Sequence, residues 1–483
     1  MNATRFWTVV FTVALVLGCK NSKYCDTSTP TCPSGLKCDP VMHACVVTDG
    51  GAGGSGGSGG AGGKTDGGGD VKVRCPETAC VGHDGGSSMC DVDAGICVDC
   101  LIDMDCKDTT RPICGANHVC RGCMATPNEC ATHVGTTACA SGTCVECASS
   151  SDCTADPKKP ICNVAGGNIC RMCQADAECQ SAPGVCMADG HCATSGEVVY
   201  VQFSASGCPL ADGTAAQPYC APNDAVTHLA GMKTVIIIVG AANSQMNLNT
   251  TSVSPIVIGR KDTGNNVGSI PATATTAVAI SAGTALIRDL TVNAGTTSTS
   301  KGILVTGSST VVSLLRVTAS LGTGLGIDAE AGTTLHMDRC LVSSNSAGGV
   351  VVSGAKYEIL NSIIANNNYG VQFSATATPV SGGLGFAFDT VVSNTGNAAT
   401  CDPSAPQTLE GSIVLGAVAN CTLDHTSTTM PTFDSTDPTR PYHLTGKLAC
   451  PQGDPLAFPI DDFDGDQRKK PLDCGADQYV VTP

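Results

Sequence analysis

Aromatic and charged residues are scarce in this chain. They make up 4% and 14% of its 483 residues, and there is a single Trp. Such a composition poorly suits a long-helix protein, whereas the 57 Gly residues suit a repetitive β-structure. Basic residues are also few, 26 against 42 acids, which gives a formal net charge of −16. This charge argues against nucleic acid as a partner.

Long apolar runs are missing apart from one near the N-terminus. Phe6 to Leu17 form an apolar run that is too short to span a bilayer, and Arg5 precedes it, so residues 1–19 are predicted to be an export signal. The run ends in Val16-Leu17-Gly18-Cys19, which resembles a bacterial lipoprotein signal, although Leu is usual where this chain has Val16. The resemblance implies that Cys19 is lipidated and anchors an exported protein in the outer membrane or at the cell surface. Ordinary signal cleavage, with Cys19 as one more disulfide partner, is the alternative.

The chain has 32 cysteines, a density that belongs to an oxidising compartment. Four lie in a small module over residues 20–49, and a Gly-rich stretch, residues 50–74, follows as a predicted flexible linker. Residues 75–195 hold five quartets, at positions 75/80/90/97, 100/106/114/120, 123/130/139/144, 147/153/162/170 and 173/179/186/192. We expect each quartet to close on itself with two disulfides, in any of three patterns. This array resembles the cysteine-rich repeats of secreted myxobacterial proteins.

The cysteine spacing has two other interpretations, a zinc site and a redox site. Cys97-x-x-Cys100 with Cys120-x-x-Cys123 has the spacing of a zinc ribbon. A zinc site there would leave Cys106 and Cys114 unpaired and would not fit an exported protein. A redox Cys-x-x-Cys site lacks the βαβ pattern that such sites have around them.

One pattern recurs five times between about Val278 and Thr395. Each copy begins with a polar or charged residue, has an aliphatic residue three positions later, and reaches a turn-forming residue after about three more. The copies begin at Asp289, Arg316, Arg339, Asn361 and Asp389, in steps of 27, 23, 22 and 28 residues. Such a period predicts a solenoid with one coil of short β-strands per repeat, in which Asn345 and Asn367 would form a hydrogen-bonded ladder. A β-sandwich with irregular strands, which needs no such period, is the alternative.

Residues 361–371, NSIIANNNYGV, resemble the coil signature of right-handed parallel β-helix repeat proteins. The stretch VVYVQFSASG resembles the opening segment of that group, and YHLTGKLAC, DDFDGDQR and DCGADQY resemble its closing segment. The resemblance implies a β-helix over residues 196–445 and a closing segment over residues 446–483. The expected fold is therefore all-β, a right-handed parallel β-helix solenoid preceded by small disulfide-rich repeats. Because this fold carries lyases, hydrolases and adhesins, it implies no single activity.

The cysteines of the predicted β-helix are few and spread out. Proximity in the sequence predicts the disulfides Cys208–Cys220, Cys401–Cys421 and Cys450–Cys474. Cys340 is left over beside Leu341 and Val342, and we expect it to be a free, buried thiol.

Several charged residues lie near equivalent places in successive coils: Arg288, Asp289, Arg316, Asp338, Arg339 and Asp389. Stacking of the coils would align them along one lateral face, as candidates for binding. Polysaccharide lyases and hydrolases of this fold use such lateral carboxylates and bases, while a solvated face of alternating charge is the structural alternative. His336 and Glu358 look isolated in the sequence. Known catalytic motifs and phosphate loops are missing, and we expect no cofactor.

Asp462, Asp464 and Asp466 flank Gly465 with a spacing that suggests a Ca²⁺ loop. The loop lacks the distal Glu of an EF-hand, so we prefer a structural turn that caps the last coil, and expect no metal.

These observations together favour a lipid-anchored surface protein with a disulfide-rich stalk and a β-helix head. We expect a non-enzymatic role in binding, adhesion or structure, with a glycan or a surface protein as the partner. A carbohydrate-active enzyme, either a polysaccharide lyase or a glycosidase on the lateral face, is the alternative, and a purely mechanical spacer is a third.

Overall fold

The computed structural model describes the backbone of residues 36–39, 44–47 and 96, and residues 89–91, 97–124, 129–130, 136–180, 183–203, 208, 210–242, 244–271, 275–434 and 442–479. The chain divides into two compact units, Met1–Val73 and Arg74–Pro483. Among the described residues, no helix is long and apolar enough to cross a membrane.

One hairpin is described in the N-terminal unit. Its strands β1 (Leu36–Asp39) and β2 (Ala44–Val47) pair antiparallel, which sets Cys38 opposite Cys45. The predicted signal with Cys19 and the predicted Gly-rich linker lie outside the described residues.

The cysteine quartets of the second unit fold as small modules. Their hairpins pair β3 (Met89–Asp91) with β4 (Ile96–Val98), β5 (Ile113–Cys114) with β6 (Cys120–Arg121), β7 (Ala138–Ala140) with β8 (Thr143–Val145), and β9 (Ile161–Asn163) with β10 (Ile169–Arg171). Short 3-10 turns end just before the second cysteine of three quartets: η1 (Asp103–Asp105), η2 (Ser150–Asp152) and η3 (Asp176–Glu178).

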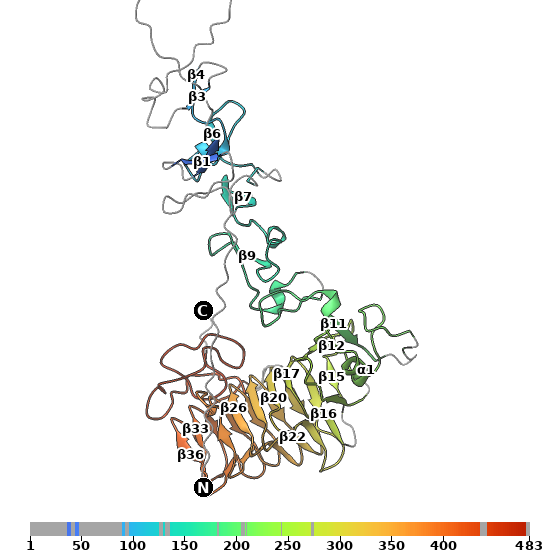
Figure 1. Cartoon of the computed structure of the whole chain (residues 1–483). Helices are drawn as coiled ribbons and strands as arrows, with labels where there is room; N and C mark the ends of the chain where they lie inside the picture. The colour runs from blue at the N-terminus through green and yellow to red at the C-terminus, as the bar shows by residue number, and fades with distance from the viewer. Residues whose placement is uncertain are drawn as a thin grey trace, which may run out of the picture. The chain divides into compact units, whose positions relative to one another are not determined.

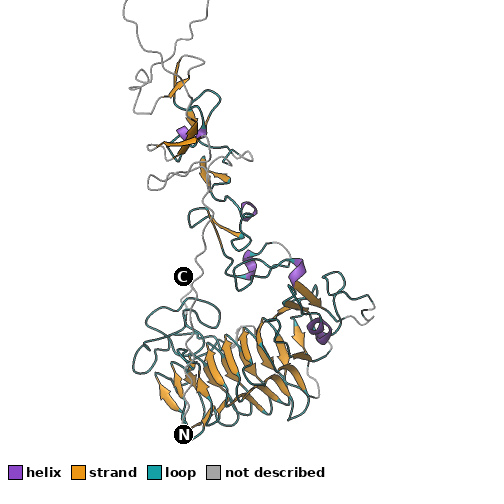
Figure 2. Cartoon of the chain, in the orientation of Figure 1, coloured by secondary structure: helices purple, strands orange, loops and turns teal. Residues whose placement is uncertain are grey.

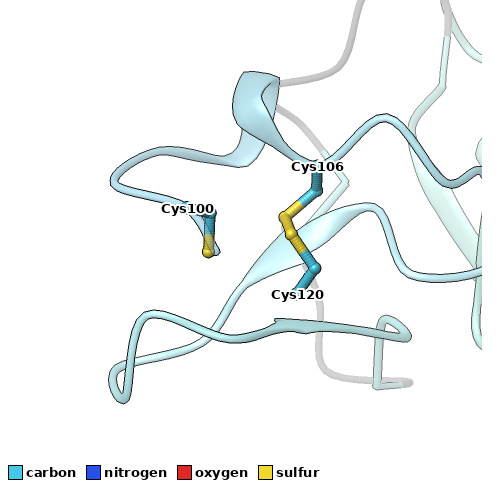
Figure 3. A group of neighbouring side chains, drawn as sticks. All are labelled: Cys100, Cys106 and Cys120. Atoms are coloured by element: carbon cyan, nitrogen blue, oxygen red, sulfur yellow. A yellow bond between two sulfur atoms is a disulfide. The ribbon is translucent and has the colours of Figure 1, made fainter. Parts of the chain in front are cut away.

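Four quartets close on themselves in one pattern, in which the first cysteine bonds to the third and the second to the fourth. The disulfides are Cys100–Cys114, Cys106–Cys120, Cys123–Cys139, Cys130–Cys144, Cys147–Cys162, Cys153–Cys170, Cys173–Cys186 and Cys179–Cys192. Figure 3 shows the second of them beside Cys100. The predicted closure is therefore confirmed for these four quartets, and their pattern, which the sequence left open, is now assigned. In the first quartet Cys90 and Cys97 are disulfide-bonded, while Cys75 and Cys80 lie outside the described residues.

The acid that precedes the second cysteine fastens the turn of each of these modules. Asp105 accepts hydrogen bonds from the backbone N–H groups of Leu101 and Ile102, at 2.8 and 2.9 Å. Glu178 accepts one from the N–H of Gln174 at 2.7 Å. These bonds satisfy backbone donors that a short turn would otherwise leave unpaired, which explains why an acid recurs at this position.

Two of the joints between modules are reinforced by side chains. Arg121 and Arg171, at the ends of their modules, each make a two-pronged ion pair with the recurring acid of the next module. The hydrogen bonds from Arg171 lower the pKa of Glu178 to about 2. Ile113 and Ile161 pack against cysteines of the same following modules, so the joints have both an ionic and an apolar contact.

The strands that follow stack in parallel as a β-helix with three sheets (Figures 1 and 2). Sheet 1 contains β11 (Val198–Val201), β12 (Val235–Val239), β14 (Ile256–Arg260), β17 (Thr284–Arg288), β20 (Val311–Leu315), β23 (Thr334–Asp338), β26 (Lys356–Leu360), β29 (Thr378–Pro379), β30 (Phe386–Ala387), β33 (Thr408–Glu410) and β36 (Thr422–Asp424). Sheet 2 contains β13 (Met246–Leu248), β16 (Thr276–Ile280), β19 (Lys301–Val305), β22 (Leu325–Glu330), β25 (Gly348–Ser353), β28 (Val371–Phe373), β32 (Ala399–Cys401) and β35 (Val418–Ala419). Sheet 3 contains β15 (Ser269–Ile270), β18 (Thr291–Asn293), β21 (Thr318–Ser320), β24 (Leu341–Ser343), β27 (Ile363–Ala365), β31 (Thr390–Val392) and β34 (Ile413–Val414).

Helical structure is slight in the described residues. The 3-10 turn η4 (Ser195–Glu197) leads into β11, and the helix α1 (Pro222–Thr227) packs Ala225 into the core of the first coil. The core consists of the inward residues of all three sheets, which alternate with outward ones along each strand, as in Val312 and Leu314 of β20. The all-β solenoid predicted from the sequence period is confirmed.

The residues that begin the repeats lie at one corner of the coil, between sheets 1 and 3. Asp289, Arg316, Arg339 and Asn361 all have positive φ there, between 49° and 55°. This left-handed conformation turns the chain from one sheet into the next, and Asn and Asp adopt it more readily than most residues. In the next coil Phe388 takes this position, with φ of 59°.

Asp389 was expected on the lateral face, and that prediction is wrong. The coil from the corner at Asn361 to the corner at Phe388 has 27 residues, one fewer than the step of 28 counted from the sequence, so Asp389 falls just after the corner and points into the coil, where it is fully buried. Its Oδ1 accepts a hydrogen bond from the N–H of Ser362 at 2.7 Å, and its own N–H donates to Oγ of Ser412 at 3.0 Å. Burial raises the pKa of this carboxyl well above its usual range.

The predicted asparagine ladder is confirmed. Nδ2 of Asn345 donates to Oδ1 of Asn367 at 3.1 Å, and Asn394 continues the ladder by accepting from the backbone N–H of Asn367 at 2.9 Å. The same side chains donate to backbone carbonyls of the preceding coils, so polar groups deep in the coil find partners.

The last cysteine module covers the outer face of sheet 1 over the first coils. Val185 and Ala193 of that module form one apolar cluster with outward residues of the sheet: Val198, Val235, Ile237, Ile256 and Ile258. Nη2 of Arg260 donates to the carbonyl of Gly184 at 2.7 Å.

The closing segment packs along the side of the β-helix, including its last coils at Ile413, and capping of the last coil by its Asp462–Asp466 turn stays a prediction. Its Ala476 and Phe463 meet the outward side chains of Ile363 and Ala365 in sheet 3. Arg468 is only 4% exposed and donates to Oδ1 of Asn361 and to two carbonyls of its own segment, each at 2.9 Å. Side packing arises because the outer faces of these coils are themselves apolar.

Candidate functional site

The candidate residues from the sequence do lie along one side of the coils, but they are not equally accessible. Arg288 is 8% exposed and pairs with Asp176 of the last cysteine module at 2.9 Å. The side chain of Arg339 is 18% exposed and pairs with Asp461 of the closing segment at 3.1 Å. These two arginines therefore fasten the flanking segments, and we correct our expectation that Arg339 faces outward like Arg316.

Asp289 and Arg316 form the most exposed ion pair of the series. Nε and Nη2 of Arg316 donate to the two carboxylate oxygens of Asp289 at 2.6 and 2.8 Å, across adjacent coils. Their side chains are 34% and 42% exposed. The hydrogen bonds to Asp289 raise the pKa of the Arg316 guanidinium. Such planar, two-pronged geometry holds both side chains in a fixed orientation at the surface.

Asp338 lies beside this pair on sheet 1. It accepts hydrogen bonds from Nε of Arg339 and from Nδ2 of Asn361, both at 3.1 Å. Its side chain is 33% exposed. Its two carboxylate oxygens are therefore both engaged while the group still reaches solvent.

His336 and Glu358, which look isolated in the sequence, are in fact neighbours on adjacent coils. They occupy paired positions of β23 and β26, and Nδ1 of His336 lies 3.1 Å from Oε2 of Glu358. The other oxygen of Glu358 accepts the N–H of Leu384 at 3.1 Å. The 22 residues between them equal the step from Arg339 to Asn361, so the repeat length was the signal that would have found the pair.

We name the outward residues between the two covered regions the open stretch. It is defined by Asp289, Ser313, Arg316, His336, Asp338 and Glu358, all of which reach solvent at least in part. Strands β20, β23 and β26 of sheet 1 contain four of these residues, Ser313, His336, Asp338 and Glu358. Asp289 and Arg316 lie at the corners that follow β17 and β20 (Figure 1). The open stretch therefore offers three carboxylates, one guanidinium and one imidazole on a rigid array.

A second group of titratable residues lies on the last coils of sheet 1. Glu410 and Asp424 occupy paired positions at the ends of β33 and β36, and His425 follows at the corner. One oxygen or nitrogen from each of the three lies within 4.8 Å of the others. Burial, and then the neighbouring Asp424, raises the pKa of Glu410. Sequence reasoning missed this group because the last coil is shorter than the repeat.

The three acids proposed for calcium serve different local contacts. Asp462 is buried, and its carboxylate accepts hydrogen bonds from the backbone N–H groups of Asp464, Asp466 and Gln478, at 2.9 to 3.1 Å. Asp464 pairs with His443 at 2.9 Å. These contacts describe a tight turn, which is the interpretation preferred from the sequence over a calcium loop.

The cysteines leave little thiol chemistry in the described part of the chain. Close cysteine groups such as Cys100, Cys106 and Cys120 are disulfide-bonded, and a disulfide sulfur is not the thiolate that a zinc ribbon needs. Disulfides join Cys208 to Cys220, Cys401 to Cys421 and Cys450 to Cys474. Cys340 is free and fully buried, and burial raises the pKa of its thiol to about 12.

Comparison with known proteins adds no assignment. The sequence matches no protein-family model. Among curated proteins, none is significantly similar to it.

Proposed function

We propose that this protein is an exported surface protein whose β-helix binds a partner along the open stretch. The observation that carries the proposal is the Asp289–Arg316 pair. It is a preorganised, half-exposed ion pair on a solenoid side that the flanking segments leave uncovered. The carboxylate of such a fixed pair can accept hydrogen bonds from hydroxyl or peptide groups, and the guanidinium can donate to them, at little further entropic cost. The partner is a glycan or another surface protein.

Export is supported by the covalent architecture. Eight disulfides in four crossed quartets, with three more in and after the β-helix, belong to an oxidising compartment. Lipidation of Cys19, which would anchor the protein in the outer membrane or at the cell surface, is the finer part of the proposal. Mass spectrometry of the mature N-terminus tests it, and an unmodified N-terminus downstream of Cys19 would rule it out.

Binding is tested with the full-length mature protein on a glycan array and on intact cells. We expect Arg316→Ala and Asp289→Ala each to weaken binding by about tenfold, a loss of roughly 1.4 kcal/mol. Lys356→Ala is the matched control, because Lys356 is an exposed charge on the same sheet outside the open stretch. Equal binding by all three variants would refute the assignment of the site.

A carbohydrate-active enzyme is the second candidate, and one observation favours it. His336 is oriented by Glu358, which is the arrangement that a general base requires. Asp338 lies two residues further along β23 on the same outward side. A polysaccharide-degradation screen decides between the two. Turnover that is abolished by His336→Gln or Asp338→Asn would replace the binding proposal with the enzyme.

A further inference from the structure

The last two coils bring two carboxylates and an imidazole into one place outside the open stretch. Glu410 and Asp424 are directly paired between the parallel strands β33 and β36, and both face outward. His425 occupies the next corner with φ of 47°, the position that Arg316 takes in an earlier coil. The ligand atoms of the three residues lie within 4.8 Å of one another.

This pairing is unfavourable unless something neutralises it. Like charges at directly opposed positions of adjacent strands destabilise a sheet. Earlier coils avoid the clash, because Arg288, Leu315, Asp338, Leu360 and Ala387 take the same outward position in turn. Glu410 and Asp424 are thus two acids in succession where the preceding coils have none adjacent.

The imidazole of His425 lies directly against the carboxylate of Asp424. Nδ1 of His425 lies 2.8 Å from Oδ1 of Asp424, yet this nitrogen is buried and makes no hydrogen bond within the described residues. The side chains of Asp424 and His425 are 45% and 22% exposed, so an ion can reach them from solvent.

We propose that Glu410, Asp424 and His425 bind one divalent transition-metal ion, with zinc as the best match. Zinc accepts mixed carboxylate and imidazole ligands in a tetrahedral site, and three protein ligands leave the fourth position for water or for a group of a partner. Calcium and magnesium prefer oxygen-only sets with more ligands, so the imidazole argues against them.

Such an ion would tie down the end of the β-helix. The last coil, from the corner at Gly411 to the corner at His425, has 14 residues, whereas the earlier coils have 22 to 27. It therefore has fewer residues that can pack against the coil before it. The metal would cross-link β33 to β36 at this point. The proposal does not depend on the open stretch, because Leu360 and Ala387, which lie between the two groups, are packed under Leu472 and its neighbours.

Calorimetric titration of the oxidised, metal-free full-length protein with zinc chloride tests the proposal. We expect one ion per chain and a zinc-dependent rise in the melting temperature, because a ligand that binds only the folded state stabilises it. Glu410→Gln and His425→Asn should each weaken zinc binding by more than about tenfold, since even the outer partners of metal ligands contribute 10–100-fold. Asn is chosen because it tolerates the positive φ of this corner.

His443→Gln is the matched control, because His443 also touches two carboxylates, Asp464 at 2.9 Å and Asp477 at 3.2 Å. Its zinc affinity should equal that of the unaltered protein. Loss of binding in His443→Gln with retention in His425→Asn would overturn the proposal. So would the absence of both zinc binding and a thermal shift in the unaltered protein, a result that no folding defect of a variant can produce.

Discussion

Arg468 should decide whether the closing segment stays on the side of the β-helix. The buried guanidinium donates to Asn361, Gly475 and Ala476, each at 2.9 Å, and lies 4.6 Å from the ring centre of Phe388. Arg468→Met keeps most of the buried length of the side chain but removes the donors. Arg468 also donates to the carbonyls of Asp461 and Asp473, at 3.2 and 3.5 Å. The carbonyl of Ala476 keeps the N–H of Phe463 as a donor, but the other acceptors lose the guanidinium, and each unsatisfied buried group costs about 1–3 kcal/mol.

Part of that cost is offset. Burial lowers the pKa of the Arg468 guanidinium to about 10, well below its usual range, so holding its charge inside costs roughly 3 kcal/mol, and Met avoids this. Breaking buried charged networks on one side typically costs about 3–5 kcal/mol, and we expect a net loss near the lower figure. A loss of about 3 kcal/mol corresponds to a roughly 100-fold increase in the open population of the segment.

Native-state hydrogen exchange, followed by mass spectrometry, measures this opening. Peptides covering residues 461–479 should lose about 100-fold protection, while β12 should keep its protection, since it lies at the other end of the sheet order. Arg316→Met, at a side chain that is 42% exposed, is the control and should leave residues 461–479 unchanged. A change below about threefold in Arg468→Met would refute the reasoning. An equal loss in β12 would show that the closing segment opens only together with the whole β-helix.

Three further predictions concern the interior of the coil. Cys340→Ala should lower the free energy of unfolding by only about 1–2 kcal/mol, because it truncates a small buried side chain, and a collapse of secretion would contradict this. Asn367→Ala removes the acceptor for Asn345 and a donor to a backbone carbonyl, and should cost about 2–3 kcal/mol in denaturant unfolding; Asn368→Ala, at an exposed neighbour, should cost under about 0.5 kcal/mol. Asp389→Asn should flatten the dependence of stability on pH. The folded pKa of Asp389 is raised, so the folded state holds the proton more tightly than the unfolded chain, and the unaltered protein loses stability as the pH rises above about 4. Unfolding at pH 5 and pH 8 should therefore differ less in the variant, and an unchanged difference would contradict the assignment.

Repetition made the interior of the β-helix predictable from sequence. Residues at equivalent places in successive coils share one environment, so Asn345 and Asn367 could be aligned by counting. The same count failed by one position at Asp389, because it aligned Asp389 with Asn361, whereas the strands set Asp389 opposite Ser362. An error of one residue exchanges the outside of the coil for the inside. His336 and Glu358 were within reach of that count and were missed because neither begins a repeat.

Contacts between different parts of the chain were not predictable in this way. Ile363 and Ala365 face outward and meet the closing segment, yet in sequence they look like any other coil residues. The cysteine spacing is compatible with three disulfide patterns, and the crossed one depends on how each module folds in three dimensions. Complementarity of surfaces is not periodic, so periodicity gives no information about it.

The crossed disulfides limit how far a module can be stretched. The chain from Cys100 to Cys120 is 20 residues long and would extend to about 70 Å if it were unlinked. With the disulfides intact, a pulling force follows a shorter covalent path. This path has six residues from Cys100 to Cys106 and then the disulfide to Cys120, across which the two Cα atoms are 5.6 Å apart. That path reaches about 25 Å. Under tension the array of cysteine modules would therefore extend very little and would transmit the force to the β-helix. Reduction of the disulfides would lengthen the array more than force alone would.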